Sequence, residues 1–354
     1  MSGPKIRCFD GVYYLFYIAG TRWKIVDGRA EPVYRIRMAV SRDGTNWKKH
    51  GKDLIAPRIE PDEAQASPDV HYHDGRYHMF FCYRYSTGYR SHTRGYRIGY
   101  AHSDDLSTWR REDDLAGLVF DPREHALLDG CREFAQSPQT LALDDGLRVY
   151  FSTRAPDAAG GKYRSHVSFA EFEDDLTTIR RVARHQVLPL GTLGAFDEHG
   201  IFPINVLSVG SEIWGYTTGW NRRVSVSVDT AIGLVVSRDG GETFLRPHGD
   251  GPVLGPSLLE PFLVGDAFVL RVGDLFHMWY IFGQRWVRET TDSPPDRVYK
   301  IAHAVSEDGQ TWVKNDGVAI IPDVLGADEC QALPSVVAYN GLYHMVFCYR
   351  DVHG

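Results

Sequence analysis

One short motif recurs along the chain, and it constrains the fold more than any other feature of the sequence. Each copy has a serine, an aspartate two residues later and an aromatic residue a few positions further on. The copies are Ser41-Asp43-Trp47, Ser103-Asp105-Trp109, Ser237-Asp239-Phe244 and Ser306-Asp308-Trp312. A degenerate copy at Asp174-Asp175 fills the widest gap, so the period is roughly 65 residues. The motif predicts a β-turn that the aspartate caps, with the aromatic residue anchoring the next strand.

A second motif precedes each copy and completes a repeating unit. It consists of a proline, an apolar strand, a polar turn and an aromatic strand, and it is clearest over residues 67–84 and 333–350. Each unit therefore predicts two strands, a third strand that ends in the serine–aspartate turn, and a short fourth strand. Four strands in a unit of this length are typical of a propeller blade. No segment shows a sustained helical period.

The sequence thus predicts an all-β chain, a five-bladed β-propeller of four-stranded blades with an extra C-terminal half blade. Six blades with an incomplete last one is the alternative. We expect one domain over 1–354, with blades at about 1–66, 67–130, 131–195, 196–258 and 259–325 and a partial blade at 326–354. The half blade would close or cap the propeller where its first and last blades meet, or swap there with another molecule. The half blade would thus allow a homo-oligomer.

Composition excludes several classes of partner. The net charge of −7 argues against nucleic acid, and no apolar run is long enough to cross a bilayer. The five cysteines form no CxxC pair, so neither a disulfide framework nor a zinc site is expected. We expect no cofactor or metal, and nothing supports a structural Ca²⁺ in the channel. The first residues carry no apolar targeting segment, which predicts a cytoplasmic protein; an extracellular or periplasmic location stays open for a truncated chain.

Acidic residues stand just before nearly every first strand of a unit. Because the first strands of a propeller line its central channel, equivalent acids would form a ring at one mouth. Glycoside hydrolysis uses two carboxyl groups, one to protonate the leaving oxygen and one to activate water or attack carbon. The alternative is that these acids only cap the turns that enter each blade. The ring would contain Glu63, Glu133, Asp197, Glu260 and Glu329.

Basic and aromatic residues recur at the other end of the same strand pairs. They would hold the hydroxyl or carboxylate groups of a sugar and stack on its rings, together with Glu329 and with His199 from the Asp197-Glu-His-Gly200 run. The alternative is that the arginines form salt bridges between blades. The residues are Arg84, Arg154, Trp220, Arg285 and Trp286.

The blade repeat, the acids and the Glu260-Pro261-Phe262 run resemble the five-bladed β-propeller glycosidases, glycoside hydrolase families 43, 32, 68, 117 and 130. The residue runs are most similar to members of that group encoded with surface-polysaccharide genes, as in Phe196-Asp197 to Pro203. The order differs from that group, because residues 1–118 resemble its later blades and its usual start resembles Val119 to Pro122. This difference indicates a permutation or a boundary shift.

The resemblance implies a glycoside hydrolase-like enzyme that cleaves or transfers a glycosyl unit of an oligo- or polysaccharide. It implies Asp197 as base or nucleophile, Glu260 as general acid, and Glu63 or Glu133 as the carboxylate that modulates or orients. Alternatives are a glycan-binding propeller without catalysis and a glycoside phosphorylase. The serine–aspartate turn also occurs in sialidases, but their arginine triad and tyrosine nucleophile have no counterpart that we can place here.

Overall fold

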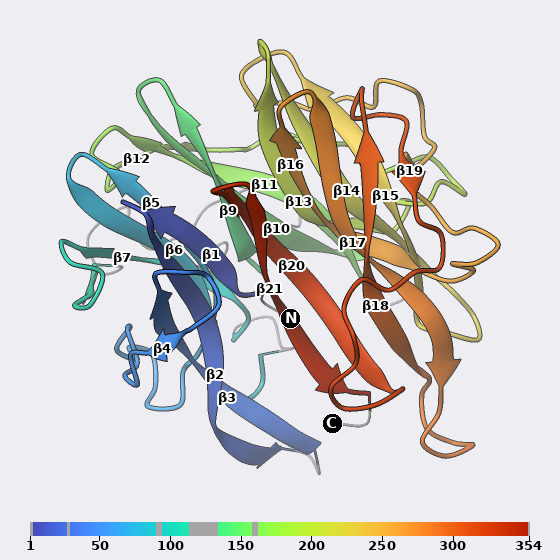
Figure 1. The fold of residues 1–354 in the computed structure, drawn as a ribbon, viewed down its shortest axis with the longest axis horizontal. Coiled ribbons are helices and arrows are strands. Elements are labelled where there is room, and N and C mark those ends of the chain that lie inside the picture. Colours follow the sequence, from blue (N-terminus) through green and yellow to red (C-terminus); the bar gives the residue numbers. More distant parts are fainter. Residues whose placement is uncertain (1–2, 27–28, 90–93, 113–133, 158–161, 353–354) are drawn as a thin grey trace. The chain divides into compact units, whose positions relative to one another are not determined.

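The computed structural model describes residues 3–26, 29–89, 94–112, 134–157 and 162–352, and the chain divides into two compact units. Unit 1 is Met1–Gln186 and unit 2 is Val187–Gly354. Every regular element in the described ranges is a β-strand, as Figure 1 shows, so the all-β class is confirmed. The predicted Val119–Pro122 run and the candidate acid Glu133 lie outside the described residues.

Unit 1 contains three antiparallel sheets, each with four strands that pair in chain order. The first sheet is β1 (Lys5–Phe9), β2 (Val12–Val26), β3 (Arg29–Ser41) and β4 (Lys48–Lys49). The second is β5 (Ala64–His73), β6 (Arg76–Arg84), β7 (Arg97–Ser103) and β8 (Arg110–Arg111). The third is β9 (Gln136–Leu143), β10 (Gly146–Asp157), β11 (Lys162–Glu173) and β12 (Ile179–Val182).

Unit 2 repeats the pattern with fewer strands. Its strands β13 (Gly200–Val209), β14 (Glu212–Arg222) and β15 (Val228–Ser237) pair in order, and Leu245 adds an isolated bridge to Val236. The next sheet is β16 (Val264–Val272), β17 (Leu275–Val287), β18 (Asp296–Ser306) and β19 (Val313–Lys314). The last is the hairpin of β20 (Glu329–Tyr339) and β21 (Leu342–Asp351), where the half blade is predicted. The blade count and the single domain stay predictions.

The first strand of four sheets carries the same irregularity. Ser67, Ser137, Asp266 and Leu333 have φ values of 49°, 56°, 52° and 56°. Strand pairing shifts register beside each of them, which is the mark of a β-bulge. A left-handed φ is costly for a residue with a Cβ, so the surrounding sheet must hold it in place.

Aromatic side chains fill the space between consecutive sheets inside each unit. In unit 1, Phe80 packs on Phe172 of the following sheet with ring centroids 4.9 Å apart. In unit 2, Trp214 stacks on Phe276 at 5.8 Å with an interplanar angle of 7°. The largest fully buried side chains in the described residues are tyrosines and phenylalanines. Much of the 12% aromatic content therefore belongs to the core, where such rings contribute strongly to stability.

The serine–aspartate turns form as predicted. Asp105 Oδ1 accepts the backbone N–H groups of Ser107 and Thr108, both at 2.8 Å, and Trp109 Nε1 donates to the carbonyl of Leu106 at 2.9 Å. Asp308 repeats the carboxylate contacts at 2.8 and 2.7 Å. The degenerate copy is real as well, because Asp175 Oδ1 accepts the N–H groups of Thr177 and Thr178 at 2.8 Å each.

Candidate functional site

The four predicted acids that the structure describes are all buried. Glu63 and Glu260 are 0% exposed, and Asp197 and Glu329 are 1% exposed. A buried carboxylate is stable only if hydrogen bonds or a cation compensate for the lost water. The partners of each acid therefore decide what it can do.

Glu63 is enclosed by four donors in unit 1. Its Oε2 accepts the N–H groups of Arg58 and Ile59 at 3.0 and 3.1 Å. Its Oε1 accepts from Gln65 Nε2 at 2.9 Å and from Arg111 Nη1 at 2.6 Å. These bonds cap the turn that leads into β5 and leave the carboxylate saturated, which favours the structural interpretation of this acid.

Glu329 repeats that arrangement in unit 2. Its Oε2 accepts the N–H groups of Val324 and Leu325 at 2.8 Å each, and its Oε1 accepts from Gln331 Nε2 at 2.9 Å. The hydrogen bonds to Glu329 and the nearby Lys300 outweigh burial and lower its pKa. It is thus an ionised turn cap, and its predicted contact with substrate remains untested.

Glu260 is held in the same manner by different residues. Lys314 Nζ donates to Oε2 at 2.7 Å, while Tyr280 Oη and the Gly317 N–H donate to Oε1 at 2.9 and 3.1 Å. Lys314 on β19 is the counterpart of Arg111 on β8. Each pairs with an alanine that stands two residues before the serine of its turn motif, Ala304 for Lys314 and Ala101 for Arg111. A general acid must reach its substrate with a proton, and both side-chain oxygens of Glu260 are already occupied by these three donors.

Asp197 differs from the other three because one of its oxygens is free. Arg246 donates to Oδ2, whereas Oδ1 is buried without a hydrogen-bond partner in the described part of the chain. Burial raises the pKa of Asp197, and the Arg246 bond only partly offsets that effect. The side chain is packed closely, because a Cβ on Gly191 or Gly219 would overlap it. Of the predicted acids described, Asp197 is the best suited to exchange a proton.

The predicted arginines have protein partners. Arg84 donates to the carbonyls of Tyr85 and Ser86, and its guanidinium lies 3.7 Å from the Tyr89 ring centroid. Arg285 Nη2 lies 2.5 Å from Asp328 Oδ1. Arg154 lies 4.7 Å from the ring centroid of Phe134. For Arg285 the geometry matches the salt-bridge interpretation; substrate contacts by these arginines remain untested.

Two of the predicted sugar-binding residues lie together. His199 and Trp220 stack with centroids 6.1 Å apart, and His199 Nδ1 lies 3.1 Å from Asn221 Oδ1. Asn221 also donates to the carbonyl of Ala195 at 2.6 Å, which anchors the loop that carries Asp197. This cluster joins the start of β13 to the end of β14.

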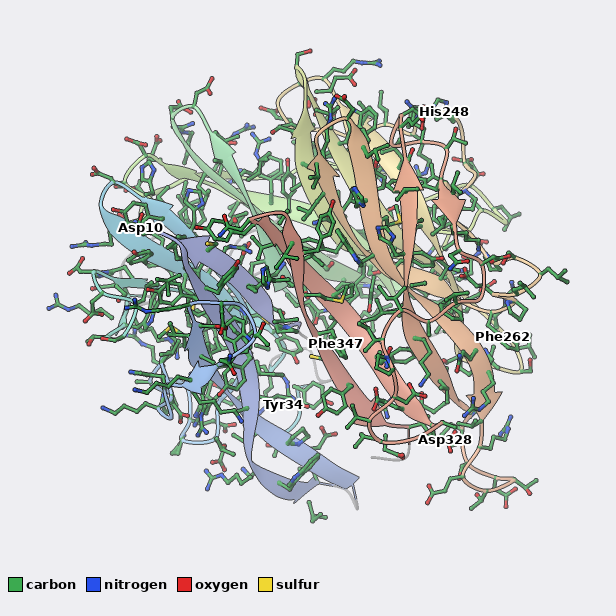
Figure 2. The ribbon with its side chains drawn as sticks, viewed as in Figure 1. Asp10, Tyr34, His248, Phe262, Asp328 and Phe347 are labelled. Carbon is green, nitrogen blue, oxygen red and sulfur yellow. The ribbon has the colours of Figure 1, made fainter. Side chains whose placement is uncertain are left out.

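A pocket of about 430 Å³ opens in unit 2, where the turn between β14 and β15 meets the residues before β16. Phe262 and Trp286 supply its aromatic surface, and Arg223 and Asp229 form an ion pair in its wall. Figure 2 labels Phe262 beside the β16–β17 sheet. Aromatic faces with a few polar groups are the usual lining of a small-molecule site. Trp286 was expected from the sequence, whereas Phe262 and the ion pair were not.

One acid with an unusual environment was missed by sequence reasoning. Asp266 occupies the left-handed bulge position of β16, and its N–H donates to Thr218 Oγ1 at 2.9 Å. Burial raises its pKa, and Arg297 opposes that shift. The signal was present: Asp266-Ala267 aligns with Ser67-Pro68 and Leu333-Pro334, but the missing proline hid the equivalence.

The described residues contain no set of three or more His, Cys, Asp or Glu side chains arranged to hold a metal ion. Cys8, Cys82, Cys330 and Cys348 are free thiols. The described ranges also lack any helix with the length and apolar character that spanning a membrane requires.

Comparisons with solved structures identify the fold. A thermostable family-43 glycoside hydrolase superposes with a TM-score of 0.57 over 91% of this chain and 94% of its own, at 14% identity. The α-L-arabinanase of Cellvibrio cellulosa, complexed with arabinohexaose, gives 0.53 over 88% and 94% at 12% identity. Zg3597, a family 117 glycoside hydrolase of the marine bacterium Zobellia galactanivorans, gives 0.52 over 77% and 73% at 16% identity.

Sequence comparison gives relatives but no family model, since none of the models matches the chain. Two proteins of Mycobacterium tuberculosis, the uncharacterized proteins MT1551 (strain CDC 1551 / Oshkosh) and Rv1502 (strain ATCC 25618 / H37Rv), are each 32% identical over 247 residues. The match covers 68% of this chain and 76% of each relative. The chain therefore belongs to the family of these two mycobacterial proteins, and its fold is that of the propeller glycoside hydrolases.

Proposed function

We propose that the protein is a glycoside hydrolase-like enzyme that cleaves or transfers a glycosyl unit of an oligo- or polysaccharide. The observation that carries the proposal is the fold shared with glycoside hydrolases over about nine-tenths of the chain. One of these neighbours is described in complex with arabinohexaose, an oligosaccharide. Fold alone does not determine function, so the residues of the site must also fit a sugar ligand and proton transfer.

The pocket supports a sugar ligand. Its volume of about 430 Å³ lies in the range of small-ligand sites. The faces of Trp286 and Phe262 would pack on the apolar face of a sugar ring, and the Arg223–Asp229 pair would bond to its hydroxyl groups. The opposite charges of that pair suit a neutral sugar at this position.

Proton transfer needs a carboxyl group that can both take up and release a proton, and a raised pKa makes a carboxylate easier to protonate. Asp197 meets this requirement and keeps one oxygen free, so we assign it the role of base or nucleophile. The second carboxyl group is Glu260, as the resemblance implies, or Asp266, whose pKa is also raised. Asp266 is the stronger candidate, because its pKa is raised, whereas both side-chain oxygens of Glu260 already accept hydrogen bonds.

One observation favours binding without catalysis. Glu63, Glu260 and Glu329 are buried and hydrogen-bonded at both carboxylate oxygens, so these acids have the geometry of turn caps. A glycan-binding propeller would keep the pocket and lack turnover. Phosphorolysis is the other alternative, and it requires phosphate as co-substrate.

A product assay separates these functions. The purified protein is incubated with arabino-, xylo- and galacto-oligosaccharides, with and without inorganic phosphate, and released sugars are separated and quantified. Hydrolysis predicts free sugars without phosphate, and a phosphorylase predicts sugar phosphates only with it. Binding in calorimetry without any product would contradict the enzymatic proposal.

Variants then assign the carboxyl groups. Asp197→Asn and Asp266→Asn should each lower kcat at least about a hundredfold, measured at a temperature where both variants are folded, since Asp197→Asn also breaks the buried pair with Arg246. Glu260→Gln should lower the unfolding midpoint, because it breaks the buried pair with Lys314. Wild-type turnover in both aspartate variants would refute the assignment.

A further inference from the structure

We propose that the first strands of unit 1 form a binding site for an anionic group of the substrate, the carboxylate of a uronic acid residue. The identity of the ligand as a sugar rests on the proposed function, whereas the site itself rests on charges within unit 1. The residues come from β1, β5 and β9, the three first strands labelled in Figure 1. None of them belongs to the pocket in unit 2.

Asp69 is the centre of this cluster and is 1% exposed. The Arg7 guanidinium donates to its Oδ1, and Thr140 donates to its Oδ2 from both N–H and Oγ1, at 2.8 and 3.0 Å. Arg7 Nε also donates to the carbonyl of Val70 at 3.0 Å. Burial raises the pKa of Asp69, but Arg7, Lys5 and Thr140 outweigh it, so the carboxylate is ionised. Both oxygens of Asp69 therefore already accept hydrogen bonds, Oδ1 from Arg7 and Oδ2 from Thr140.

Lys5 is the second cation of the cluster, and the charge of Asp69 acts on both Lys5 and Arg7. Its Nζ donates one hydrogen bond, to Gln139 Oε1 at 3.1 Å, within the described part of the chain. An ammonium group has three N–H donors, so two are left for a ligand. Burial lowers the pKa of Lys5, and the nearby charge of Arg7 lowers it further, against the opposing effect of Asp69. A partly buried cation with one neutral partner is destabilised until an anion pairs with it.

The charge balance indicates which anion fits. Among the described residues the cluster contains the side chains of Arg7 and Lys5 and one carboxylate, that of Asp69, so with Lys5 protonated it has one excess positive charge, which matches a singly charged carboxylate better than a phosphate dianion. His71 follows Asp69 on β5, and burial lowers its pKa, so near neutral pH its ring is uncharged and suited to a sugar hydroxyl.

The experiment compares two ligands with the same sugar chain, one with free carboxylates and one with uncharged methyl esters. Trigalacturonate and its fully methyl-esterified form are titrated into the full-length protein by calorimetry at low salt. We expect the charged ligand to bind at least about tenfold tighter, the value of one charge-assisted hydrogen bond. Lys5→Gln should abolish the difference, Lys5→Arg should retain it, and Lys48→Gln, which removes an exposed lysine on β4, should leave it unchanged.

Each other outcome overturns part of the argument. Equal affinity of the wild-type protein for the two ligands would overturn the anion site. So would a Lys5→Gln variant that keeps the wild-type unfolding midpoint and the wild-type preference for the charged ligand. Displacement of trigalacturonate by millimolar inorganic phosphate, in a manner that needs Lys5, would identify free phosphate as the ligand and overturn the uronate assignment. Charge-dependent binding without product would support the site and contradict the hydrolase, and hydrolysis with no charge preference would do the reverse.

Discussion

Arg111 Nη1 lies 2.6 Å from Glu63 Oε1 although the two residues are 48 positions apart, and neither side chain is more than 7% exposed. The pair ties the start of β5 to β8, the fourth strand of the same sheet. In unit 2, Lys314 and Glu260 make the corresponding pair at 2.7 Å. Glu63 and Glu260 are thus each held by a cation from the fourth strand of their own sheet.

Loss of one partner of such a pair should destabilise the protein strongly. Arg111→Met leaves the Glu63 carboxylate buried without its cation, and we expect a loss of about 3 kcal/mol in the free energy of unfolding. Urea denaturation measures it. The matched control is Arg76→Met, which breaks an exposed pair with Asp104 and should change stability little. Equal effects of the two variants would contradict the role of the buried pair.

Trp286 should determine ligand affinity without affecting the fold. Trp286→Ala removes the aromatic wall of the pocket and should raise Kd for a bound oligosaccharide about tenfold. Trp23 provides the control, because Gly20-Thr-Arg-Trp23 matches Gly283-Gln-Arg-Trp286 and its side chain is 68% exposed. Calorimetry should find Trp23→Ala unchanged. If both substitutions weaken binding equally, the pocket is not the sugar site.

The serine–aspartate turns should contribute to acid stability. Hydrogen bonds from Thr108 and Ser107 lower the pKa of Asp105 to about 2, against about 3.9 in an unfolded chain. A lowered folded pKa gives stability that is present above about pH 4 and is lost as the pH falls toward 2. Asp105→Asn should therefore weaken the fall of the unfolding free energy between pH 4 and 2. Asp104→Asn, which removes an exposed neighbour bonded to Arg76, should retain the wild-type profile.

Gly219 should not tolerate a side chain. A Cβ there would lie 2.4 Å from both the Asp197 Cβ and the Phe196 ring, so Gly219→Ala must displace the loop before β13. We expect a loss of about 1–3 kcal/mol from overpacking, together with lower activity through Asp197. Gly20→Ala, where nothing lies within 4 Å, is the control. Thermal unfolding and the product assay measure the two effects, and a Gly219→Ala protein that matches wild type in both would contradict the packing described here.

The sequence predicted those features whose causes are local. The aspartate turns form from residues within five positions of each other, so motif and structure agree for Asp43, Asp105 and Asp308. The strand pairs also follow, because alternation and turn residues act over the same short range. The all-β class and the family resemblance therefore came from the sequence alone.

Other features depended on distant partners and could not be read from one chain. Glu63 was singled out, but its partner Arg111 lies on another strand, so the sequence could not decide between a catalytic acid and a turn cap. The hydrogen-bond partners of a buried carboxylate depend on how the sheets pack. They separate Asp197, whose Oδ1 has no partner in the described part of the chain, from Glu260, which accepts from three donors. Asp266 was missed because Ala267, the residue after it, stands where the other repeats have proline.

The cradle around Glu63 is repeated around Glu329, and this has a consequence for how the chain reaches its native state. The hairpins β5–β6 and β20–β21 share Asp-Glu-x-Gln-Ala at their start and Phe-Cys-Tyr-Arg at their end. Gln65 accepts from the Ile36 N–H and Gln331 from the Ile301 N–H, so each hairpin docks in the same way. A folding chain thus holds two hairpins that can compete for one place, a kinetic trap that duplicated segments create. Refolding should accordingly be slow and should lose yield as protein concentration rises, through exchange of hairpins between molecules.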